Sequence, residues 1–576
     1  MDQQKRTLVA LGLCLLLTAI YWTFFMPSTS PNRPVAVSDS ADGGVQPVIA
    51  PPNQAPAQPP SSPPDDSGPV IQIERSRPLV RYLFSSRGAG LLQAELRGRK
   101  MKEQLHLTLE DGFRRLLGGK EPPAPPMDMA RPIPSQFLPL AISIEGSQPL
   151  SGNIRYQPSD GAPSDSSITW STTSPNWDVS KKFEFSGEGF ETTYTISLHN
   201  TGSQAATGEF AITYGREVDP RAEEKPSMFG GVGNLSSAAC SVGDDFQRLM
   251  PDSKPTSEFR GQINFVGIDQ QYFLAAVFPL EGAREGRCVL SATASSRAVT
   301  VYFPLQVGPG QTVVQKFGVF VGPKDMDLLV SVPSRLSIAT EAPTAKASPH
   351  LEKAIDFGIW AFICRILLAI LKFFHGVFGN WGVAVIGLTV LVKLVLLPLT
   401  HKSMVSAEAM KKLQPRVEEL RKKYAQDKER QNLEMMKLYQ EAKVNPLGGC
   451  LPMLLQMPVW FALFTTLRNT YDIYGEPFIP PLWLDLTYKD PTYILPTALG
   501  VTMIVTQRLQ PQVMDAAQAK VMTYLMPVLF TGFMMNYPAG LTLYIFTNNL
   551  LSIAQQYGLR KYLEGKATVK PLEKRK

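Results

Sequence analysis

The chain has 576 residues, of which 44% are hydrophobic and 19% charged, and its formal net charge is +7. This length exceeds one compact domain, because domains usually hold about 100–200 residues. Residues 27–350 have the composition of a water-soluble protein, whereas residues 355–560 are dominated by apolar runs. The composition therefore excludes a single soluble globular domain.

The N-terminus carries Lys5 and Arg6 before an apolar stretch at 7–25. A cleaved signal peptide would have a shorter apolar region followed by an Ala-x-Ala site, which is missing here. We therefore predict a retained transmembrane anchor over residues 1–26, with a signal peptide as the alternative.

Residues 27–69 hold many of the 49 prolines, together with Ser, Gln and Asp. Such a segment cannot bury enough apolar surface to fold, so it is predicted to be a disordered, extended linker.

Residues 70–350 show the alternation of apolar and polar residues that is typical of half-buried antiparallel strands. We predict a large β-sandwich domain here. Cys240 and Cys288 lie within it, and they could form a disulfide if the domain faces an oxidising compartment. Their spacing alone does not decide this. The alternation is clearest at Tyr194, Ile196 and Leu198, at Phe210, Ile212 and Tyr214, and at Val299, Val301 and Phe303.

Residues 351–379 are apolar and aromatic but include Arg365 and Lys372, which are seven residues apart and share a helical face. If this segment crossed the membrane, residues 402–444 with their eleven Lys and Arg would lie outside, against the positive-inside rule. We therefore predict an amphipathic helix in the membrane interface.

The remaining apolar runs predict a five-span core over residues 380–559, which gives six spans with the N-terminal anchor. The acidic loop 469–492 would lie outside, and the basic tail 560–576 would lie inside the cytoplasm. Both termini would then be cytoplasmic and residues 27–350 periplasmic. The five spans are 381–399, 447–467, 493–509, 521–536 and 539–557.

Residues 402–444 predict a cytoplasmic antiparallel helical hairpin with a polar break at 426–430. One arm repeats apolar residues at 4-3-4 spacing, and the second arm offers a matching face. A plain solvated spacer remains the alternative to a docking role. The two apolar faces are predicted at Leu413, Val417, Leu420 and Tyr424, and at Leu433, Met436 and Tyr439.

Lys393 lies inside the apolar run 381–399. An ammonium at that depth costs ~2.5–3.5 kcal/mol even on lenient scales, so it needs a partner or water. The other predicted spans contain no Asp or Glu, which indicates a wet cavity. The alternative is snorkelling towards His401, which lies ~12 Å away along the helix. Thr389 shares the face of Lys393.

The spans carry further polar residues, among them Gln456 and Thr506. Each of these alone could simply join helices. The sequence has no phosphate-binding loop, no nucleophile elbow and no metal-binding histidine pair. We expect no cofactor, no metal and no enzyme activity, although a β-sandwich could bind or process sugars without a linear motif.

Five segments resemble the YidC-type membrane protein insertases (the YidC/Oxa/Alb family) in its Gram-negative form. The likeness runs in the same order along nearly the whole chain, apart from the linker. The segments are NPLGGCLPMLLQMPVW at 445–460, YPAGLTLY at 537–544, LPLT at 397–400, DQQYF at 269–273 and VGPKD at 321–325.

The resemblance implies a bacterial inner-membrane insertase and chaperone with a five-helix core, a hydrophilic groove and a periplasmic β-supersandwich that is not known as an enzyme. Many relatives have arginine where this chain has Lys393, so positive charge is kept but the planar fork is lost. The predicted groove residues are Lys393, Thr389, Gln456, Thr506 and Tyr544.

The resemblance also implies partners: nascent membrane proteins, the Sec translocon, the ribosome and membrane lipids, with no nucleic-acid recognition beyond ribosome contact. The basic hairpin residues expected to contact substrate or ribosome are Lys411, Lys412, Arg416, Arg421, Lys422 and Lys423.

Two other classes of function are compatible with parts of the pattern. A transporter or channel would also need polar residues in its spans, but it usually shows internal repeats or paired charges. A membrane-anchored envelope protein would explain the β domain but not five elaborate spans. Deleting the outer domain separates these classes, because an insertase would keep its activity.

Overall fold

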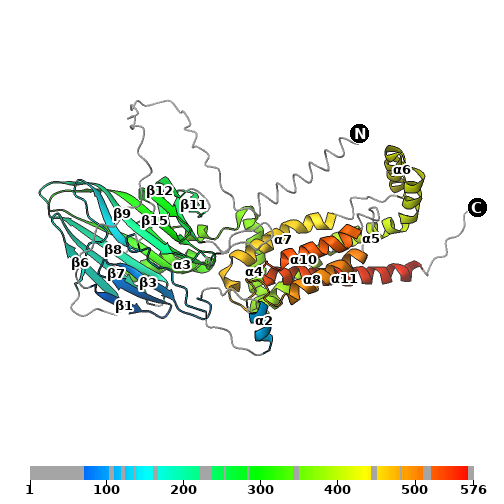
Figure 1. The fold of residues 1–576 in the computed structure, drawn as a ribbon, viewed down its shortest axis with the longest axis horizontal. Helices are drawn as coiled ribbons and strands as arrows, with labels where there is room; N and C mark the ends of the chain where they lie inside the picture. The colour runs from blue at the N-terminus through cyan, green and yellow to red at the C-terminus, as the bar shows by residue number, and fades with distance from the viewer. Residues whose placement is uncertain are drawn as a thin grey trace, which may run out of the picture.

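The computed structural model describes residues 70–102, 109–117, 124–134, 136–159, 166–187, 189–220, 223, 236–251, 255–281, 284–340, 349–442, 451–480, 483, 485–509 and 520–567. The predicted anchor 1–26, the linker 27–69 and the end of the basic tail, 568–576, lie outside the described residues. The chain forms a β-rich part and a helical part, with a helical hairpin at the end far from the strands (Figure 1).

The β-rich part contains a large antiparallel sheet of thirteen strands and a small sheet of three. The large sheet has the order β4-β9-β15-β14-β12-β13-β16-β8-β7-β6-β5, with β10 and β11 attached at β12. The strands are β1 Gln72–Ser76, β2 Val80–Ser85, β3 Gly90–Leu96, β4 Ala141–Gly146, β5 Gln157–Pro158, β6 Ser167–Thr173, β7 Trp177–Phe185, β8 Glu191–Asn200, β9 Ala206–Glu217, β10 Ser237–Val242, β11 Asp245–Leu249, β12 Thr256–Asp269, β13 Phe273–Pro279, β14 Arg284–Ala292, β15 Ser296–Val307 and β16 Thr312–Pro323.

The two sheets pack face to face through aromatic side chains. The ring centroids of Tyr82 and Phe185 lie 5.4 Å apart, and those of Phe84 and Phe183 lie 4.8 Å apart. Burial explains the alternation of apolar and polar residues in the sequence, because the apolar residues of β8, β9 and β15 that predicted strands are all buried. The prediction of a β-rich domain followed by a helical part is confirmed.

Two helices interrupt the segment that was predicted to be all β. Helix α2 (Leu109–Leu116) lies between β3 and β4, and α3 (Met326–Thr340) follows β16. In α3, Leu329, Val332 and Leu336 are buried and recur at helical spacing. The short amphipathic pattern was overlooked inside a long stretch of strand pattern.

The helical part begins after α3. In Figure 1 the long helices α5, α7, α8, α10 and α11 run together away from the β-rich part, whereas α4 lies crosswise at their near ends. The elements are η1 Leu351–Ala354, η2 Gly358–Trp360, α4 Ala361–Phe378, α5 Trp381–Lys423, α6 Lys428–Glu441, α7 Leu451–Asn469, η4 Tyr471–Ile473, α8 Ile494–Leu509, η5 Val521–Leu525, α10 Met526–Met534 and α11 Ala539–Ala567.

Two helical segments are long and apolar enough to cross a membrane by length and composition, Gly358–Phe378 and Trp381–His401. Ile494–Leu509 and Val521–Met534 are shorter apolar helices. The first segment includes α4, which was predicted to lie in the interface. One face of α4 is buried at Leu367 and Leu371, and the opposite face is exposed at Phe362 and Phe373.

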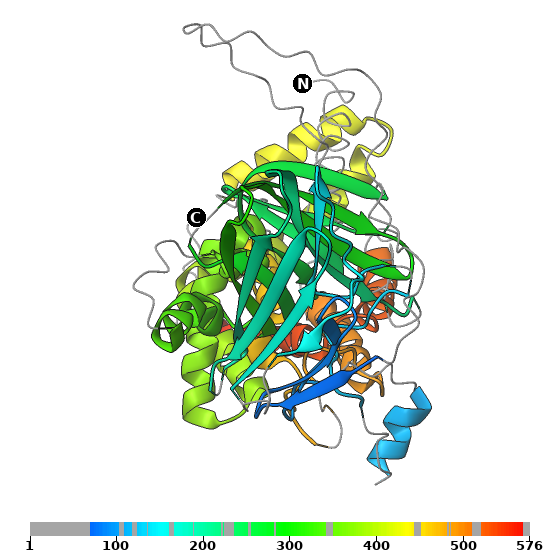
Figure 2. The ribbon, with the colours of Figure 1, turned by 90° about the vertical axis from the view of Figure 1, so that its left-hand side faces the viewer.

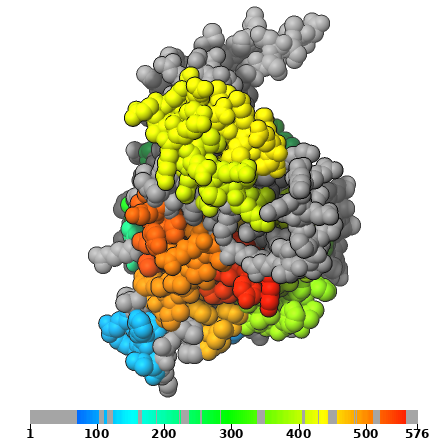
Figure 3. Space-filling view, turned by 90° about the vertical axis from the view of Figure 1, so that its right-hand side faces the viewer, coloured from blue at the N-terminus to red at the C-terminus, as the bar shows by residue number. Residues whose placement is uncertain are grey.

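Helix α5 continues without a break from the predicted span into the hairpin, despite Pro398 and Pro415. The arms then pack through Met410, Val417 and Tyr439, with three apolar neighbours. The face predicted for the second arm is partly wrong, since Leu433 and Met436 are 61% and 45% exposed. Leu438 and Met435 take their place, because the short second arm carries two overlapping apolar patterns. Figure 3 shows the hairpin projecting beyond the helical part.

The β-rich part is fixed to the helical part by a buried ionic cluster. Asp269 accepts hydrogen bonds from Lys324 Nζ at 2.8 Å and from Arg248 Nε at 2.7 Å. Both cations also donate to the carbonyl oxygen of Ala354 in η1, and Arg248 pairs with Asp356 at 3.1 Å. Burial lowers the pKa of Lys324, and Asp269 opposes this effect. The two family-like segments 269–273 and 321–325 therefore meet at this joint.

Candidate functional site

The site is centred on Lys393 in α5, which is half-buried between α5 and α11. Asn380 caps the start of α5 by accepting a hydrogen bond from Val383 N at 3.0 Å. Lys393 Nζ donates to Ser552 Oγ of α11 at 2.8 Å, and Ser552 Oγ donates to the carbonyl of Asn548 at 2.8 Å. Because a hydroxyl carries no charge, this contact satisfies one donor of the ammonium without neutralising it.

The ammonium stays at the depth of its own backbone. Lys393 lies ~18 Å along α5 from Trp381, and Ser552 lies ~20 Å along α11 from Ala539, at ~1.5 Å per residue. Both helices begin on the side of the β-rich part (Figure 1). The contact with Ser552 therefore directs the side chain towards the neighbouring helix rather than to the distant end of α5.

A second polar contact continues the same row on α11. Gln456 Nε2 of α7 donates to Asn548 Oδ1 at 2.7 Å and lies 3.4 Å from the hydroxyl of Tyr544. Tyr544, Asn548 and Ser552 are four residues apart and therefore share one face of α11. This face, called the polar row below, joins α7 and α5 through side chains.

Not all predicted groove residues join this row. Thr389 is buried, and its hydroxyl donates to Val385 O in its own helix at 2.7 Å. Thr506 on α8 donates in the same way to Thr502 O at 2.8 Å. The structure thus brings together Lys393, Gln456 and Tyr544. It leaves the hydroxyls of Thr389 and Thr506 engaged with their own backbones.

Asn548 and Ser552 were not among the predicted site residues, although they hold the row together. Their signal in the sequence was the four-residue spacing from Tyr544 along α11. Farther along, Gln555 Nε2 of α11 donates to Thr400 Oγ1 of α5 at 3.0 Å. In the described part of the chain, two buried amide atoms of α11, Asn549 Nδ2 and Gln556 Oε1, have no hydrogen-bond partner. Buried polar groups normally have one, so these atoms fit contact with water or a polar substrate.

Apolar side chains lie on the outside of the bundle, both next to Lys393 and on other helices. Leu394 and Val395, which follow Lys393 directly, are 59% and 68% exposed. Val501 on α8 and Val528 on α10 are exposed in the same way. Lys393 therefore lies at the boundary between the polar row and an apolar outer surface.

The basic residues predicted on the hairpin lie on its outer surface. Lys412, Arg416, Lys422 and Lys423 are exposed, and Arg421 is half-buried. The side chain of Lys411 lies outside what the structure describes. The exposed cations stand opposite the apolar contact between the two arms.

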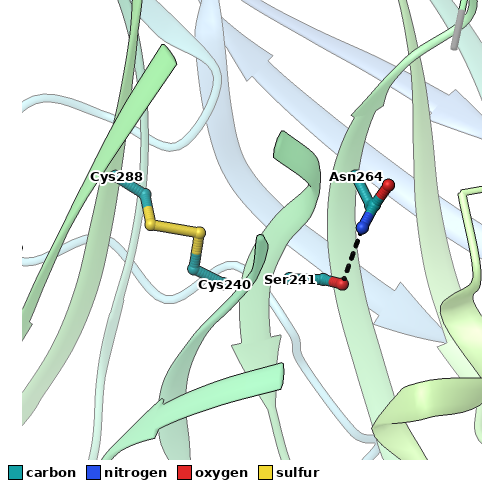
Figure 4. Close-up of a disulfide and its surroundings, with 4 residues drawn as sticks. All are labelled: Cys240, Ser241, Asn264 and Cys288. Carbon is teal, nitrogen blue, oxygen red and sulfur yellow. Dashed lines mark hydrogen bonds between the residues drawn. A yellow bond between two sulfur atoms is a disulfide. The ribbon is translucent and has the colours of Figure 1, made fainter. Parts of the chain in front are cut away.

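Cys240 and Cys288 are joined by a disulfide in the β-rich part (Figure 4). They lie on β10 and β14, which both pair with β12. Beside the disulfide, Asn264 Nδ2 donates to Ser241 Oγ at 3.2 Å. The bond closes a 48-residue separation in the sequence.

Together with Lys393 and Gln456, the polar row offers an ammonium, two hydroxyls and two amides, which bind and orient polar groups. Among the described residues, no group of three or more His, Cys, Asp or Glu side chains is placed to share a metal ion. What the site supplies is positive charge and hydrogen-bonding capacity within an apolar bundle.

Two family models match the chain. The model of the 60Kd inner membrane protein matches residues 373–566, and that of the YidC periplasmic domain matches residues 144–370. Together they cover the helical part and most of the β-rich part.

Curated relatives extend these matches. The membrane protein insertase YidC of Anaeromyxobacter dehalogenans (strain 2CP-C) is 38% identical over 449 residues, 76% of this chain and 78% of its own. The YidC of Anaeromyxobacter sp. (strain Fw109-5) is 41% identical over 66% of both chains. The YidC of Geobacter sulfurreducens is 36% identical over 69% of this chain and 70% of its own.

Solved structures give weaker matches. An active YidC insertase with its first transmembrane domain resolved covers 86% of this chain and 93% of its own, at 17% identity and a TM-score of 0.36. A putative aldose 1-epimerase of Escherichia coli K12 covers 44% of this chain and 99% of its own, at 10% identity and a TM-score of 0.27. Neither TM-score is high enough to define the fold.

Proposed function

The chain belongs to the YidC family of membrane protein insertases, and on that premise we propose that its polar row carries the insertion step. The observation that carries this proposal is the contact of Lys393 with Ser552, which turns an uncompensated positive charge towards α11 within an apolar bundle. Gln456 extends the row onto α7.

The mechanism follows from the cost of moving polar chain through lipid. A polar tail must cross ~30 Å of hydrocarbon, where charges are costly. A hydrated polar row from the cytoplasmic side to the level of Lys393 shortens that path. The ammonium attracts acidic residues of the moving tail, and the row supplies hydrogen bonds while the tail is desolvated.

Release is driven by the apolar part of the substrate. Because the outer surface beside Lys393 is apolar and exposed, a hydrophobic segment at the row leaves sideways into lipid. No step in this scheme forms or breaks a covalent bond, so the scheme needs neither nucleotide nor metal.

We also propose the topology. Six spans, including the anchor 1–26, place both termini in the cytoplasm and residues 27–350 in the periplasm of the bacterial inner membrane. The disulfide of the β-rich part agrees with an oxidising compartment. The exposed basic residues of the hairpin agree with the cytoplasmic side.

Helix α4 is placed in the interface in this topology, although its length would also permit a span. Its crosswise orientation in Figure 1 supports this placement. Lys372 of α4 also pairs with Asp327 of α3 at 2.9 Å and with Asp472 at 3.5 Å. Both partners lie outside the predicted spans, so Lys372 is held outside the spans, beside α3 and η4.

The substrates are nascent membrane proteins, with the Sec translocon and the ribosome as further partners. The exposed cations of the hairpin supply a surface for the ribosome or for the incoming chain. The hairpin also lies between the span in α5 and the next span, α7, in chain order. A role as a plain spacer is therefore compatible with the same geometry.

Photo-crosslinking tests the proposed function. A photoreactive residue at Gln456 should capture a stalled single-span substrate, whereas one at Val501 on the exposed surface of α8 should capture lipid instead. Equal capture of substrate at the two positions would contradict a path along the polar row.

A further inference from the structure

Helix α2 is a feature of the β-rich part that the insertion step does not use. It lies in the connection from β3 to β4 and projects from the body of the molecule (Figures 1 and 2). Figure 2 places it on the flank opposite to α4, and Figure 3 shows the same separation from the other end. In Figure 1 both helices lie at the boundary between the strands and the long helices, and both run crosswise to the latter.

The position of α2 along the helical bundle is set by its contact with the residues just before α8. Gly112 is buried against Pro491, so closely that a Cβ atom at this glycine would lie 2.9 Å from the carbonyl carbon and oxygen of Pro491. Pro491 itself belongs to a rigid turn, because Asp490 accepts hydrogen bonds from Thr492 N at 2.9 Å and Leu495 N at 2.8 Å. Helix α2 is therefore held where α8 begins.

The side of α2 away from Pro491 carries apolar side chains. Phe113 is 46% exposed and Leu117 is 86% exposed. Leu117 directly follows the last residue of α2, and its backbone N donates to Phe113 O at 3.1 Å, so the two side chains project from the same side of this last turn. Glu110 and Arg114 pair at 2.8 Å. Glu110 lies seven residues before Leu117 on the same side of the helix, so the charged pair borders the apolar side chains directly. The helix end thus offers an apolar face with a charged border.

We propose that α2 is a second interfacial helix, which docks the periplasmic β-rich part on the outer surface of the lipid bilayer. This inference rests on the proposed topology. The occupant is lipid because the apolar pair lies at the level where α8 enters the membrane, beside and not within the helical bundle. Aromatic side chains are favoured at this depth.

The interaction is weak in isolation but acts within one chain. Two partly exposed side chains cannot hold a free domain on a membrane, yet the β-rich part is already tethered at its joint with η1. Because the β-rich part is already tethered, its second contact, that of α2 with the membrane, forms at high effective concentration. With α4 on one flank and α2 on the other, the β-rich part is restrained from tilting about that joint.

Spin labelling of the full-length protein in lipid nanodiscs tests this proposal. Single cysteines are placed at Phe113→Cys and Leu117→Cys in a chain that lacks Cys14, Cys364 and Cys450 but keeps the disulfide. Accessibility to oxygen, which enters lipid, is compared with accessibility to a water-soluble nickel chelate. Val314→Cys is the matched control, because Val314 is a 52% exposed apolar residue of β16 at the end remote from the joint.

Labels at Phe113 and Leu117 are expected to show an oxygen-to-nickel ratio several-fold above that at Val314. A ratio equal to that at Val314 for both labels would overturn the proposal. Leu394→Cys on the outer surface of α5 serves as the reference for a membrane span. If that label also reports water, the proposed topology itself fails; if it reports lipid while the α2 labels report water, only the docking of α2 fails.

Discussion

Lys393 Nζ lies 2.8 Å from Ser552 Oγ, and this hydrogen bond joins α5 to α11 within the apolar helical part. Ser552 Oγ donates its hydrogen bond to the carbonyl oxygen of Asn548, so its lone pairs are free to accept from the lysine. The charge is held in place without being cancelled. A substrate carboxylate could therefore still be attracted to it.

Replacing the hydroxyl tests how far the lysine depends on it. Ser552→Ala should lower the free energy of unfolding in the bilayer by about 0.6 kcal/mol, the average for hydrogen bonds between membrane helices, and by no more than about 1.7 kcal/mol. It should also reduce substrate insertion. Ser552→Thr keeps the hydroxyl and should behave as wild type. Thr497→Ala, which removes a hydroxyl bonded only to its own helix, is the control. Steric trapping in lipid measures the free energy of unfolding. Identical values for Ser552→Ala and wild type would contradict the positioning role of the hydroxyl.

The joint between the two parts should be sensitive to the charge on Asp269. Asp269→Asn leaves Lys324 buried without its carboxylate, and breaking a buried pair from one side costs ~3–5 kcal/mol. Hydrogen exchange at residues 351–356 should therefore rise strongly. Glu184→Gln removes a carboxylate from an exposed pair with Lys182 and should change little. Unchanged protection at the joint in the Asp269 variant would show that the apolar contacts suffice.

The β-rich part should show a pH dependence caused by Lys181. This side chain is fully buried, and its Nζ donates to the carbonyls of Gly88 at 2.6 Å and Leu140 at 2.9 Å. Burial lowers the pKa of Lys181 well below its usual value of 10.5. Between the lowered pKa and 10.5 the unfolded chain binds more protons than the folded one, so stability rises with pH in that window.

Thermal unfolding from about pH 7 to about pH 9.5 measures this slope. Lys181→Met should flatten it whatever its effect on the melting temperature at neutral pH. Lys182→Met, at the neighbouring exposed position, should leave the slope unchanged. A parallel slope in the Lys181 variant and wild type would mean that the lysine keeps an ordinary pKa when folded.

Loss of the disulfide should destabilise the β-rich part. Closing a separation of 48 residues restricts the unfolded chain, which is worth about 4 kcal/mol on the loop-entropy relation. The double variant Cys240→Ala/Cys288→Ala should therefore unfold at clearly lower denaturant concentration. Reductant should shift wild type in the same direction and leave the double variant unaffected. A denaturation midpoint that neither change moves would contradict a stabilising bond.

Much of the architecture could be predicted from periodicity. The alternation in β8, β9 and β15 reflects burial of one face, and a lysine within an apolar run marked the site. Two features were missed because their signals are short. Helix α2 has eight residues inside a strand-rich stretch, and the second arm of the hairpin carries two overlapping apolar patterns.

The pairing within the site could not be predicted either. Thr389 shares a helical face with Lys393, yet its hydroxyl bonds the backbone of α5. The partner of the lysine is Ser552, 159 residues away. Spacing within one helix reports which residues are neighbours on that helix, whereas the contact between two helices depends on how they pack.

The most direct test of the account is insertion of a short single-span substrate with an acidic tail into proteoliposomes, scored by protease protection. Lys393→Arg should insert the substrate as wild type does, Lys393→Ala should be impaired, and Lys393→Glu should be impaired most, because it repels the tail. Lys182→Glu, a charge reversal on the exposed surface of β7 in the β-rich part, should insert normally. Equal insertion by wild type, Lys393→Ala and Lys393→Glu would contradict the central claim that the charge at Lys393 drives insertion.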